Sequence, residues 1–277
     1  MLGAVKARIP KGARRAYNEA RTRAKGFFRA FGFFKIARRK VRGTVIRIAV
    51  SSNLEQYRAD SYATKEPETL DWLDQNLRDG DVLFDVGANI GLYALYGAKI
   101  RPGCTVYAFE PEAQNFSRLC GNIRLNALGN VVPCNFPLSD KDAFGLLHVT
   151  ESQAGSALNS FGRPSDFHPS PAAPTFKQGA LSTNLDTLIE KRGLPAPTLM
   201  KIDVDGLEDD ILRGAANLLR SGKLRGLLVE LNLPDGAKPS PAIRDLEACG
   251  YTLVRKGDSV WECAGIKSQN LIFALAR

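Results

Sequence analysis

Residues 81–91 read DVLFDVGANIG, a segment whose residue types suit the binding of a small ligand. An apolar run ends in the acid Asp85, and a turn containing Gly87, Asn89 and Gly91 follows before a helix-like stretch. In open α/β sheets small ligands bind where strands end at their carboxyl edge. Glycines let a ligand approach the main chain closely. The segment therefore predicts a binding turn, with an ordinary strand–helix connection as the alternative.

A second acid, Glu110, ends the next apolar run, CTVYAFE, 25 residues after Asp85. An acid at the end of the second strand is the usual partner of two ribose hydroxyls in nucleotide-binding folds. Together the two strand ends predict an adenosine-binding half-fold.

The turn disfavours NAD, FAD and ATP as the adenosine cofactor. Dinucleotide sites carry G-x-G-x-x-G, whereas here Asn89 takes the second glycine position and Asp85 precedes the first. A carboxylate at that place repels a pyrophosphate but suits the amine and sulfonium of S-adenosylmethionine. No G-x-x-x-x-G-K-[ST] phosphate loop occurs in the sequence.

At this point the chain resembles the FkbM-type methyltransferases, a branch of the S-adenosylmethionine-dependent class I methyltransferases. The resemblance covers roughly residues 65–275. It departs from the family's usual pattern at Asp205, where the family has glutamate. It rests on ordered motifs, namely FDVGANIGLYAL (84–95), VYAFEPEAQNFSRLCGNIRLNAL (106–128), PLSD (137–140), TNLDTLIEKRGL (183–194), LMKIDVDGLEDDILRGA (199–215), LLVELN (227–232) and NLIFAL (270–275).

Alternating strand and helix patterns, with helices expected over 68–77 and 207–220 and a further strand near 146–150, predict an α/β fold with a mostly parallel sheet and helices on both faces. The resemblance implies the Rossmann-like class I form, with seven strands and an antiparallel last strand. It also implies the cofactor contacts: Asp85 and Gly87 near the methionyl part, Asn89 and Gly91 shaping the turn, Glu110 on the ribose hydroxyls, Pro111 stiffening the next turn, and Ser139 and Asp140 near the adenine.

Candidate catalytic residues follow the strand pattern at 199–203. Lys201, Asp203 and Asp205 fall on one side of an extended chain. Glu208 begins the next helix, where the helix dipole favours a carboxylate. A neutral hydroxyl is a poor nucleophile, so a methyl acceptor of this kind needs a base. Asp203, at the carboxyl edge, is the first candidate, with Lys201, Asp205 and Glu208 beside it.

Each of these residues also has a structural alternative. Asp205 or Glu208 can cap the helix, and Lys201 can pair with Asp203 or Glu230. Asp203, Asp205 and Glu230 can in principle hold Mg²⁺, although nothing in the sequence requires a metal and none is predicted. His148 is an alternative base, but a lone histidine beside a hairpin is more often structural.

The net charge of +9 is concentrated at one end of the chain. Residues 1–42 hold 14 Lys/Arg and one acid (+13), so the remainder carries about −4. Aromatic residues recur at helical spacing over 17–34, which predicts a basic arm that can form an amphipathic helix. The alternatives for this arm are peripheral contact with an anionic membrane and packing on the domain or in an oligomer. No nucleic-acid module is recognisable, and the oligomeric state stays open.

The rest of the chain, 43–277, is predicted to be one methyltransferase domain of sufficient length and apolar content (44%) for a full core. Residues 151–180 are rich in Ser, Pro, Gly and Ala and are expected to be an irregular loop, either a substrate lid or a plain insertion. No apolar run approaches the roughly 20 residues of a membrane span, and no secretory segment is present. Five scattered cysteines indicate reduced thiols. A cytoplasmic enzyme is expected.

The sequence thus predicts a methyltransferase that uses S-adenosylmethionine and methylates a hydroxyl of a sugar, glycan or natural product. An N- or protein methyltransferase of the same fold is the first alternative. A module that binds the adenosine cofactor without catalysis is the second, and a dehydrogenase is disfavoured by Asp85 and Asn89.

Overall fold

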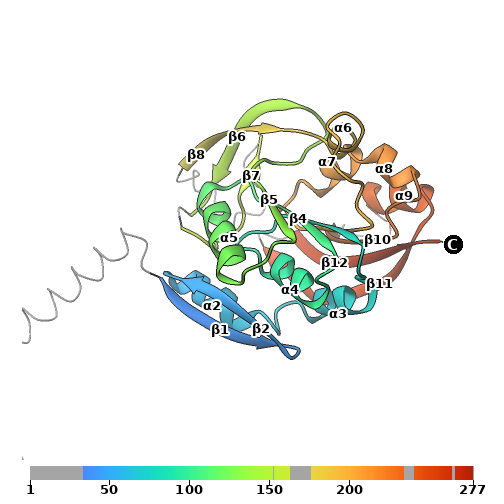
Figure 1. The fold of residues 1–277 in the computed structure, drawn as a ribbon. Helices are drawn as coiled ribbons and strands as arrows, with labels where there is room; N and C mark the ends of the chain where they lie inside the picture. The colour runs from blue at the N-terminus through green and yellow to red at the C-terminus, as the bar shows by residue number, and fades with distance from the viewer. Residues whose placement is uncertain (1–33, 152, 163–175, 234–239, 264–265, 277) are drawn as a thin grey trace, which may run out of the picture.

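The computed structural model describes residues 34–151, 153–162, 176–233, 240–263 and 266–276. Its centre is a seven-stranded sheet in the order β11-β12-β10-β9-β3-β4-β5, with β12 antiparallel to both its neighbours and the other pairs parallel (Figure 1). This confirms the predicted α/β class and the antiparallel last strand. The strands are β3 (Val82–Val86), β4 (Thr105–Phe109), β5 (Val131–Cys134), β9 (Leu199–Ile202), β10 (Gly226–Leu233), β11 (Tyr251–Cys263) and β12 (Ile266–Leu275).

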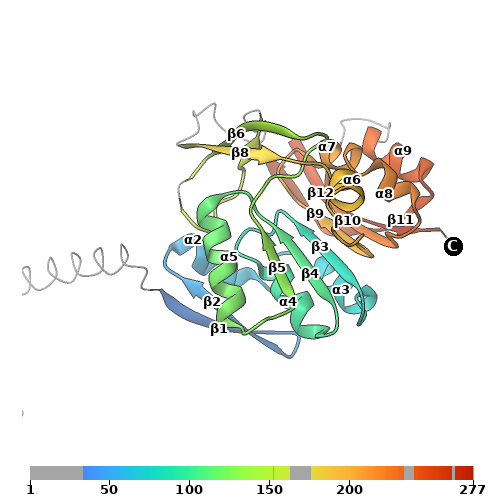
Figure 2. The ribbon, with the colours of Figure 1, turned by 45° about the horizontal axis from the view of Figure 1, so that its top comes forward.

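Helices cover both faces of the sheet, as predicted (Figure 2). One face packs against α3 (Pro67–Asn76), α4 (Leu92–Ile100) and α5 (Ala113–Leu125), the other against α6 (Leu185–Glu190), α7 (Glu208–Arg213), α8 (Ala216–Arg220) and α9 (Pro241–Ala248). The helix expected over 207–220 is two helices, with Gly214 as the C-cap of the first and Ala215 as the N-cap of the second. At this break the chain passes so close to the Ser139 carbonyl oxygen that a Cβ on Gly214 would lie 2.2 Å from it.

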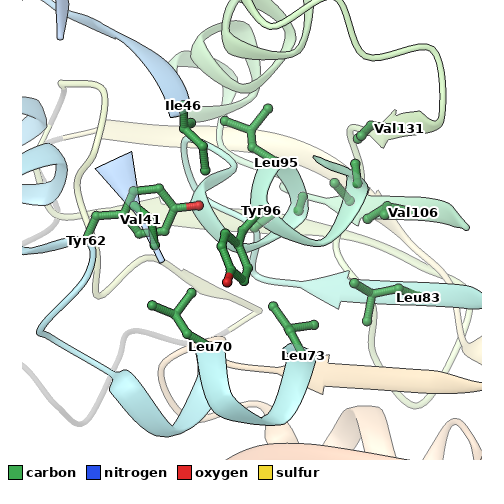
Figure 3. Close-up of a cluster of buried hydrophobic side chains, with 14 of the residues drawn as sticks. Val41, Ile46, Tyr62, Leu70, Leu73, Leu83, Leu95, Tyr96, Val106 and Val131 are labelled. Carbon is green, nitrogen blue, oxygen red and sulfur yellow. The ribbon is translucent and has the colours of Figure 1, made fainter. Parts of the chain in front are cut away.

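Two apolar cores hold these layers together, one on each side of the sheet. In the first, Leu70 and Leu73 of α3 meet Leu95 of α4 and Leu83 of β3, all almost fully buried (Figure 3). The Leu70 and Leu73 spacing was expected from the helical pattern at 68–77. Burial of these side chains stabilises the sheet. Because β3, β4, β9 and β10 run parallel, their carboxyl ends lie along one edge.

A hairpin of β1 (Lys35–Val41) and β2 (Thr44–Val50) lies beside α2 (Asn53–Ser61) (Figure 1). Residues 35–41, expected within the basic arm, are therefore strand. The other edge of β2 is held by α5, since Asn122 accepts a hydrogen bond from Ala49 N at 2.9 Å and Asn126 pairs with the main chain of Arg47. The helical pattern expected over 17–34 lies, up to residue 33, outside the described residues.

A second small sheet occupies part of the region expected to be an irregular loop. It joins β6 (Ala143–Val149), β7 (Ser160–Phe161) and β8 (Phe176–Ser182) in the order β7-β6-β8, all antiparallel. The strand expected near 146–150 is thus confirmed and is longer. The Ser- and Pro-rich composition of 151–180 shows no strand pattern, so β7 and the start of β8 were not predicted. Pro133 is tolerated in β5 because β5 is an edge strand.

Candidate active site

The turn after β3 is locked against the end of β9. Gly87 has φ +82°, and a Cβ there would lie 1.8 Å from the carbonyl oxygen of Asp203. Asp203 N in turn donates to Val86 O at 3.1 Å. Asn89 also has a left-handed φ of +52°, and Gly91 (φ +93°) caps the N-terminus of α4. The predicted binding turn and the predicted catalytic strand end therefore touch.

Gly87→Ala should lower the free energy of unfolding by at least about 2 kcal/mol, because the left-handed backbone and the approach to Asp203 both penalise a Cβ. Gly80→Ala is a matched control, since Gly80 has φ +86° but no atom within 4 Å of a Cβ placed there. Urea unfolding of both variants measures the difference. Equal losses would show that the contact with Asp203 contributes nothing.

Glu110 lies at the end of β4, buried beside the turn. Its Oε2 accepts from Asn89 N at 2.8 Å and its Oε1 accepts from Glu112 N at 2.9 Å. Burial raises the pKa of Glu110 to about 7, against the lowering effect of these two N–H groups. Each carboxylate oxygen has a further lone pair, so the pair can accept from two vicinal hydroxyls.

Residues 155–158 form a segment, here called the strap, that is hydrogen-bonded to three separate parts of the site. Ser156 O accepts from the side-chain amides of Asn89 (2.7 Å) and Asn115 (3.1 Å). Gly155 N donates to Asn115 Oδ1 at 2.7 Å, and Leu158 N donates to Asp205 Oδ2 at 2.7 Å. The strap thus bridges the turn, the start of α5 and the end of β9.

Two adjoining cavities lie beneath the strap. The larger, about 210 Å³, runs from Gly87 and Asn89 to Lys201, Asp203 and Glu230. The smaller, about 60 Å³, is lined by Glu110, Pro111 and Asn115. They share five lining residues, namely Gly87, Asn89, Ala157, Asp203 and Asp205. One elongated ligand can therefore reach from the Glu110 carboxylate to the Asp203 carboxylate.

Asp203 is the centre of a charged cluster at the end of β9. Lys201 Nζ lies 2.7 Å from Asp203 Oδ2 and 5.2 Å from the centre of the Tyr93 ring. Burial alone would raise the pKa of Asp203, but the Lys201 ammonium outweighs it and holds that pKa well below the usual range. Asp203 is therefore ionised at neutral pH.

Glu230 of β10 completes this cluster. A hydrogen bond joins its carboxyl group to Asp203, and Ser268 Oγ donates to its Oε1. Burial, followed by the negative charge of Asp203, raises the pKa of Glu230 far above its usual range. Glu230 is thus protonated at neutral pH and donates to Asp203, a role that the sequence pattern did not reveal.

Asp85 is almost fully buried, and neither of its oxygens accepts a hydrogen bond of normal geometry. Burial raises its pKa to about 6, although the positive charge of Lys201 acts in the opposite direction. It lines neither of the two cavities but lies behind them, beside Lys201. A buried carboxylate without donors favours a cationic group nearby.

Asp205 and Glu208 line the larger cavity and also make structural contacts. Asp205, at φ +59°, holds the strap through Leu158. Glu208 accepts from Val204 N at 3.1 Å and from Gly206 N at 3.0 Å, so it ties the loop before α7. Neither residue caps α7, whose N-terminus has no side-chain cap, so the capping alternative is wrong. Both instead hold the loop segments around the cavity.

Ser139 and Asp140 are not brought to the cavities. Both lie against Gly214 at the end of α7, and Ser139 N donates to Thr183 O at 3.0 Å. Asn115 and Ser156 occupy the place beside Glu110 instead. Pro137 and Leu138 of the same PLSD segment do line a small neighbouring cavity with Gly87 and Pro111, so only the end of the motif turns away, toward Gly214. His148 lies on β6 and lines neither cavity.

Other cavity residues come from elements that the sequence pattern did not connect with the site. They are Arg58 and Ser61 of α2, Tyr62, Lys65 and Glu66 before α3, Tyr93 of α4, Asn232 of β10 and Trp261 of β11. Within the described ranges no group of three or more His, Cys, Asp or Glu side chains is arranged to hold a metal ion.

Comparison with known proteins decides the family. Residues 85–253 match the methyltransferase FkbM domain, which is more than half of the chain. The chain belongs to the FkbM methyltransferase family. This FkbM methyltransferase is 29% identical to 31-O-demethyl-FK506 methyltransferase FkbM of Streptomyces tacrolimicus over 67% of this chain and 78% of that protein. It is 31% identical to hexuronic acid methyltransferase AglP of Haloferax volcanii, over 66% of this chain and 69% of that protein.

A crystal structure of methyltransferase FkbM from Methylobacillus flagellatus is similar over 80% of this chain and 55% of that one, at 14% identity and a TM-score of 0.43. Family membership makes this FkbM methyltransferase a transferase that depends on S-adenosylmethionine. The paired acceptor atoms of Glu110, which lines the smaller cavity, fit a ligand with a diol, whereas Asp85 lies behind the cavities beside Lys201 and does not line them.

Proposed function

We propose that this FkbM methyltransferase methylates a hydroxyl group of a sugar or natural-product acceptor. The observation that carries the proposal is the ionised Asp203 carboxylate in a cavity continuous with the Glu110 compartment. A carboxylate at this point can accept the proton of a hydroxyl. The names of the two relatives, one acting on 31-O-demethyl-FK506 and one on hexuronic acid, support an oxygen acceptor.

Asp203 is proposed as the group that accepts the hydroxyl hydrogen bond and then the proton. Lys201 keeps Asp203 ionised and fixes its orientation. Glu230, held by Ser268, shares a hydrogen bond with Asp203, so charge that arises on one carboxyl group is spread over the pair. Asp205 and Glu208 position the strap and the loop that surround this carboxylate.

S-adenosylmethionine, when bound, supplies a methyl group already activated on sulfur. Glu110 is proposed to hold its ribose hydroxyls, with Pro111 and Asn115 beside it. Gly87 and Asn89 are proposed to form a wall of this compartment. Gly91 lines neither cavity and is proposed only to shape the turn, since it packs against Leu119. Asp85 would place negative charge behind the positively charged part. The strap, which lines both cavities, is proposed to limit the access of water to the space between Glu110 and Asp203.

Calorimetric titration with S-adenosylmethionine and S-adenosylhomocysteine, with NAD as control, tests the cofactor. Transfer of a radioactive methyl group to a panel of glycans and polyketide alcohols tests the acceptor. Micromolar binding of the first two ligands, no binding of NAD and label on a hydroxyl oxygen are the expected results. Label on nitrogen would favour the N- or protein methyltransferase. Binding with no transfer to any acceptor would favour a non-catalytic module.

Peripheral contact with an anionic membrane is proposed for the basic N-terminal part of the chain. Residues 1–33 contain nine Lys/Arg and one acid. The hairpin that follows adds Arg38 and Arg47, which lie directly opposite one another, with exposed Ile36 and Val45 on the same face. Like charges opposite on paired strands are unfavourable alone, and anionic headgroups would relieve them. Among the described helices none has the length and apolar composition of a bilayer crossing.

Removing residues 1–33 should lower the fraction of the protein that floats with phosphatidylglycerol-containing vesicles more than about tenfold. Each Lys or Arg near such a surface contributes roughly 1 kcal/mol to the binding free energy. The truncation ends before β1, so the hairpin is kept. Vesicles of phosphatidylcholine alone are the control. Equal flotation of the full chain and the truncated form would rule out this contact.

A further inference from the structure

Arg58 is a cation without a carboxylate partner at the wall of the larger cavity. It lies in the last turn of α2, is half-buried, and lines the cavity together with Lys201 and Asp203. Its Nε donates to Gly155 O of the strap. Within the part of the chain that the structure describes, no Asp or Glu oxygen lies at ion-pair distance from its guanidinium group.

The other charged side chains of this cavity are partnered. Lys65 pairs with Glu66 at 2.9 Å, and Lys201 pairs with Asp203 at 2.7 Å. The carboxylates of Asp205, Glu208 and Glu230 all accept hydrogen bonds, from Leu158 N, from Val204 N and Gly206 N, and from Ser268 Oγ respectively. Among the described cations of this cavity, Arg58 is therefore the one that makes no ion pair, although its charge acts at longer range on Asp205.

The strap contact accounts for only one of the five guanidinium N–H groups. The remaining four form the planar fork that binds carboxylates in a bidentate manner. The position at the end of α2 stabilises a positive charge but supplies no partner for this fork. Lys65 lines the same cavity, but its charge is already paired with Glu66. An anionic group of a ligand would complete this wall.

We propose that Arg58 binds a carboxylate group of a ligand in this cavity, an inference that rests on the proposed function. Two sources have the required chemistry: the amino-acid carboxylate of the cofactor and a carboxylate on the acceptor, as in a uronic acid. Arg58 lines the same cavity as the Asp203–Glu230 pair. A zwitterionic or acidic ligand therefore complements it.

Calorimetry on the full chain distinguishes the cofactor source. S-adenosylhomocysteine carries the amino-acid carboxylate, whereas 5′-methylthioadenosine has the same nucleoside without it. Arg58→Gln should weaken S-adenosylhomocysteine binding roughly 10- to 100-fold, as expected for loss of a charge-assisted hydrogen bond, and should leave 5′-methylthioadenosine binding within about twofold. Arg58→Lys should restore part of the loss. Equal weakening of both ligands would mean that Arg58 acts only by holding the strap, and would overturn the proposal.

The acceptor source is tested with methyl glucuronide and methyl glucoside, titrated in the presence of 5′-methylthioadenosine. A loss of glucuronide binding in Arg58→Gln, with glucoside binding unchanged, assigns Arg58 to the acceptor. Unchanged binding of both S-adenosylhomocysteine and glucuronide overturns the proposal. Arg39→Gln, which removes an exposed charge paired with Asp60, is the matched control. If the unmodified protein binds neither nucleoside, the proposed function itself fails, and the glucuronide titration without nucleoside decides the role of Arg58.

Discussion

Asp203→Asn should lower kcat by roughly 10²- to 10⁴-fold, the range typical for loss of a general base, and should leave the affinity for S-adenosylhomocysteine within about twofold. Asparagine keeps the size of the side chain but cannot accept a proton. The carboxylate lies where both cavities meet and is kept ionised by Lys201. Single-turnover kinetics with labelled S-adenosylmethionine would measure the methyl-transfer step directly.

Asp210→Asn is a suitable control, because Asp210 lies on the next helix and pairs with Arg213 away from the cavities. Its kcat should match that of the unmodified enzyme. The loss of the Lys201 partner could also disturb the fold of Asp203→Asn, so its urea unfolding must be compared. A stable Asp203→Asn protein with full turnover would remove Asp203 from the chemistry and leave Glu230 as the next candidate.

Glu110→Ala should weaken S-adenosylmethionine and S-adenosylhomocysteine roughly 10- to 100-fold, because two charge-assisted hydrogen bonds to the ribose are worth about 1.5–3 kcal/mol. The same carboxylate accepts from Asn89 N and Glu112 N, so its removal also loosens the turn. Isothermal titration calorimetry gives the affinity, and thermal unfolding without ligand gives the cost to the fold.

Glu110→Gln separates these two effects. Glutamine keeps one acceptor oxygen and the packing of the side chain, but it loses the charge and the second acceptor. Its affinity should fall between those of the unmodified protein and Glu110→Ala, while its stability should change less. Unchanged affinity of the alanine variant would refute the ribose assignment and would shift attention to Asn115, which lines the same small cavity.

The elements of the central sheet were predictable because their signals are local. Val82-Leu83-Phe84 followed by Asp85 and Gly87, and the second apolar run before Glu110, mark strand ends by composition alone. The ordered motifs then gave the family and the antiparallel last strand, which the structure confirms. Strands and helices of this kind are set by short-range periodicity.

The features of the candidate site that the sequence did not predict depend on contacts between segments far apart in the chain. Ser139 and Asp140 follow a strand like the other site residues, but packing against Gly214 keeps them from the cavities. Arg58 reaches the cavity only because the β1–β2 hairpin, held by Asn122 of α5, sets the position of α2. The partnership of Glu230 with Asp203 requires β10 to pair with β9. No local pattern contains this information.

The close approach of Gly87 to the carbonyl of Asp203 has a consequence for how new substrate ranges can arise in such an enzyme. The turn after β3 and the end of β9 cannot be altered separately, so the proposed cofactor turn and the proposed base must be inherited as one block. Substitutions should cost less stability in the segments that border this block. These segments are α2 with Arg58, the strap, and the strand that carries Trp261. Laboratory evolution toward a different acceptor should therefore randomise those borders and leave the 85–91 and 201–208 blocks untouched.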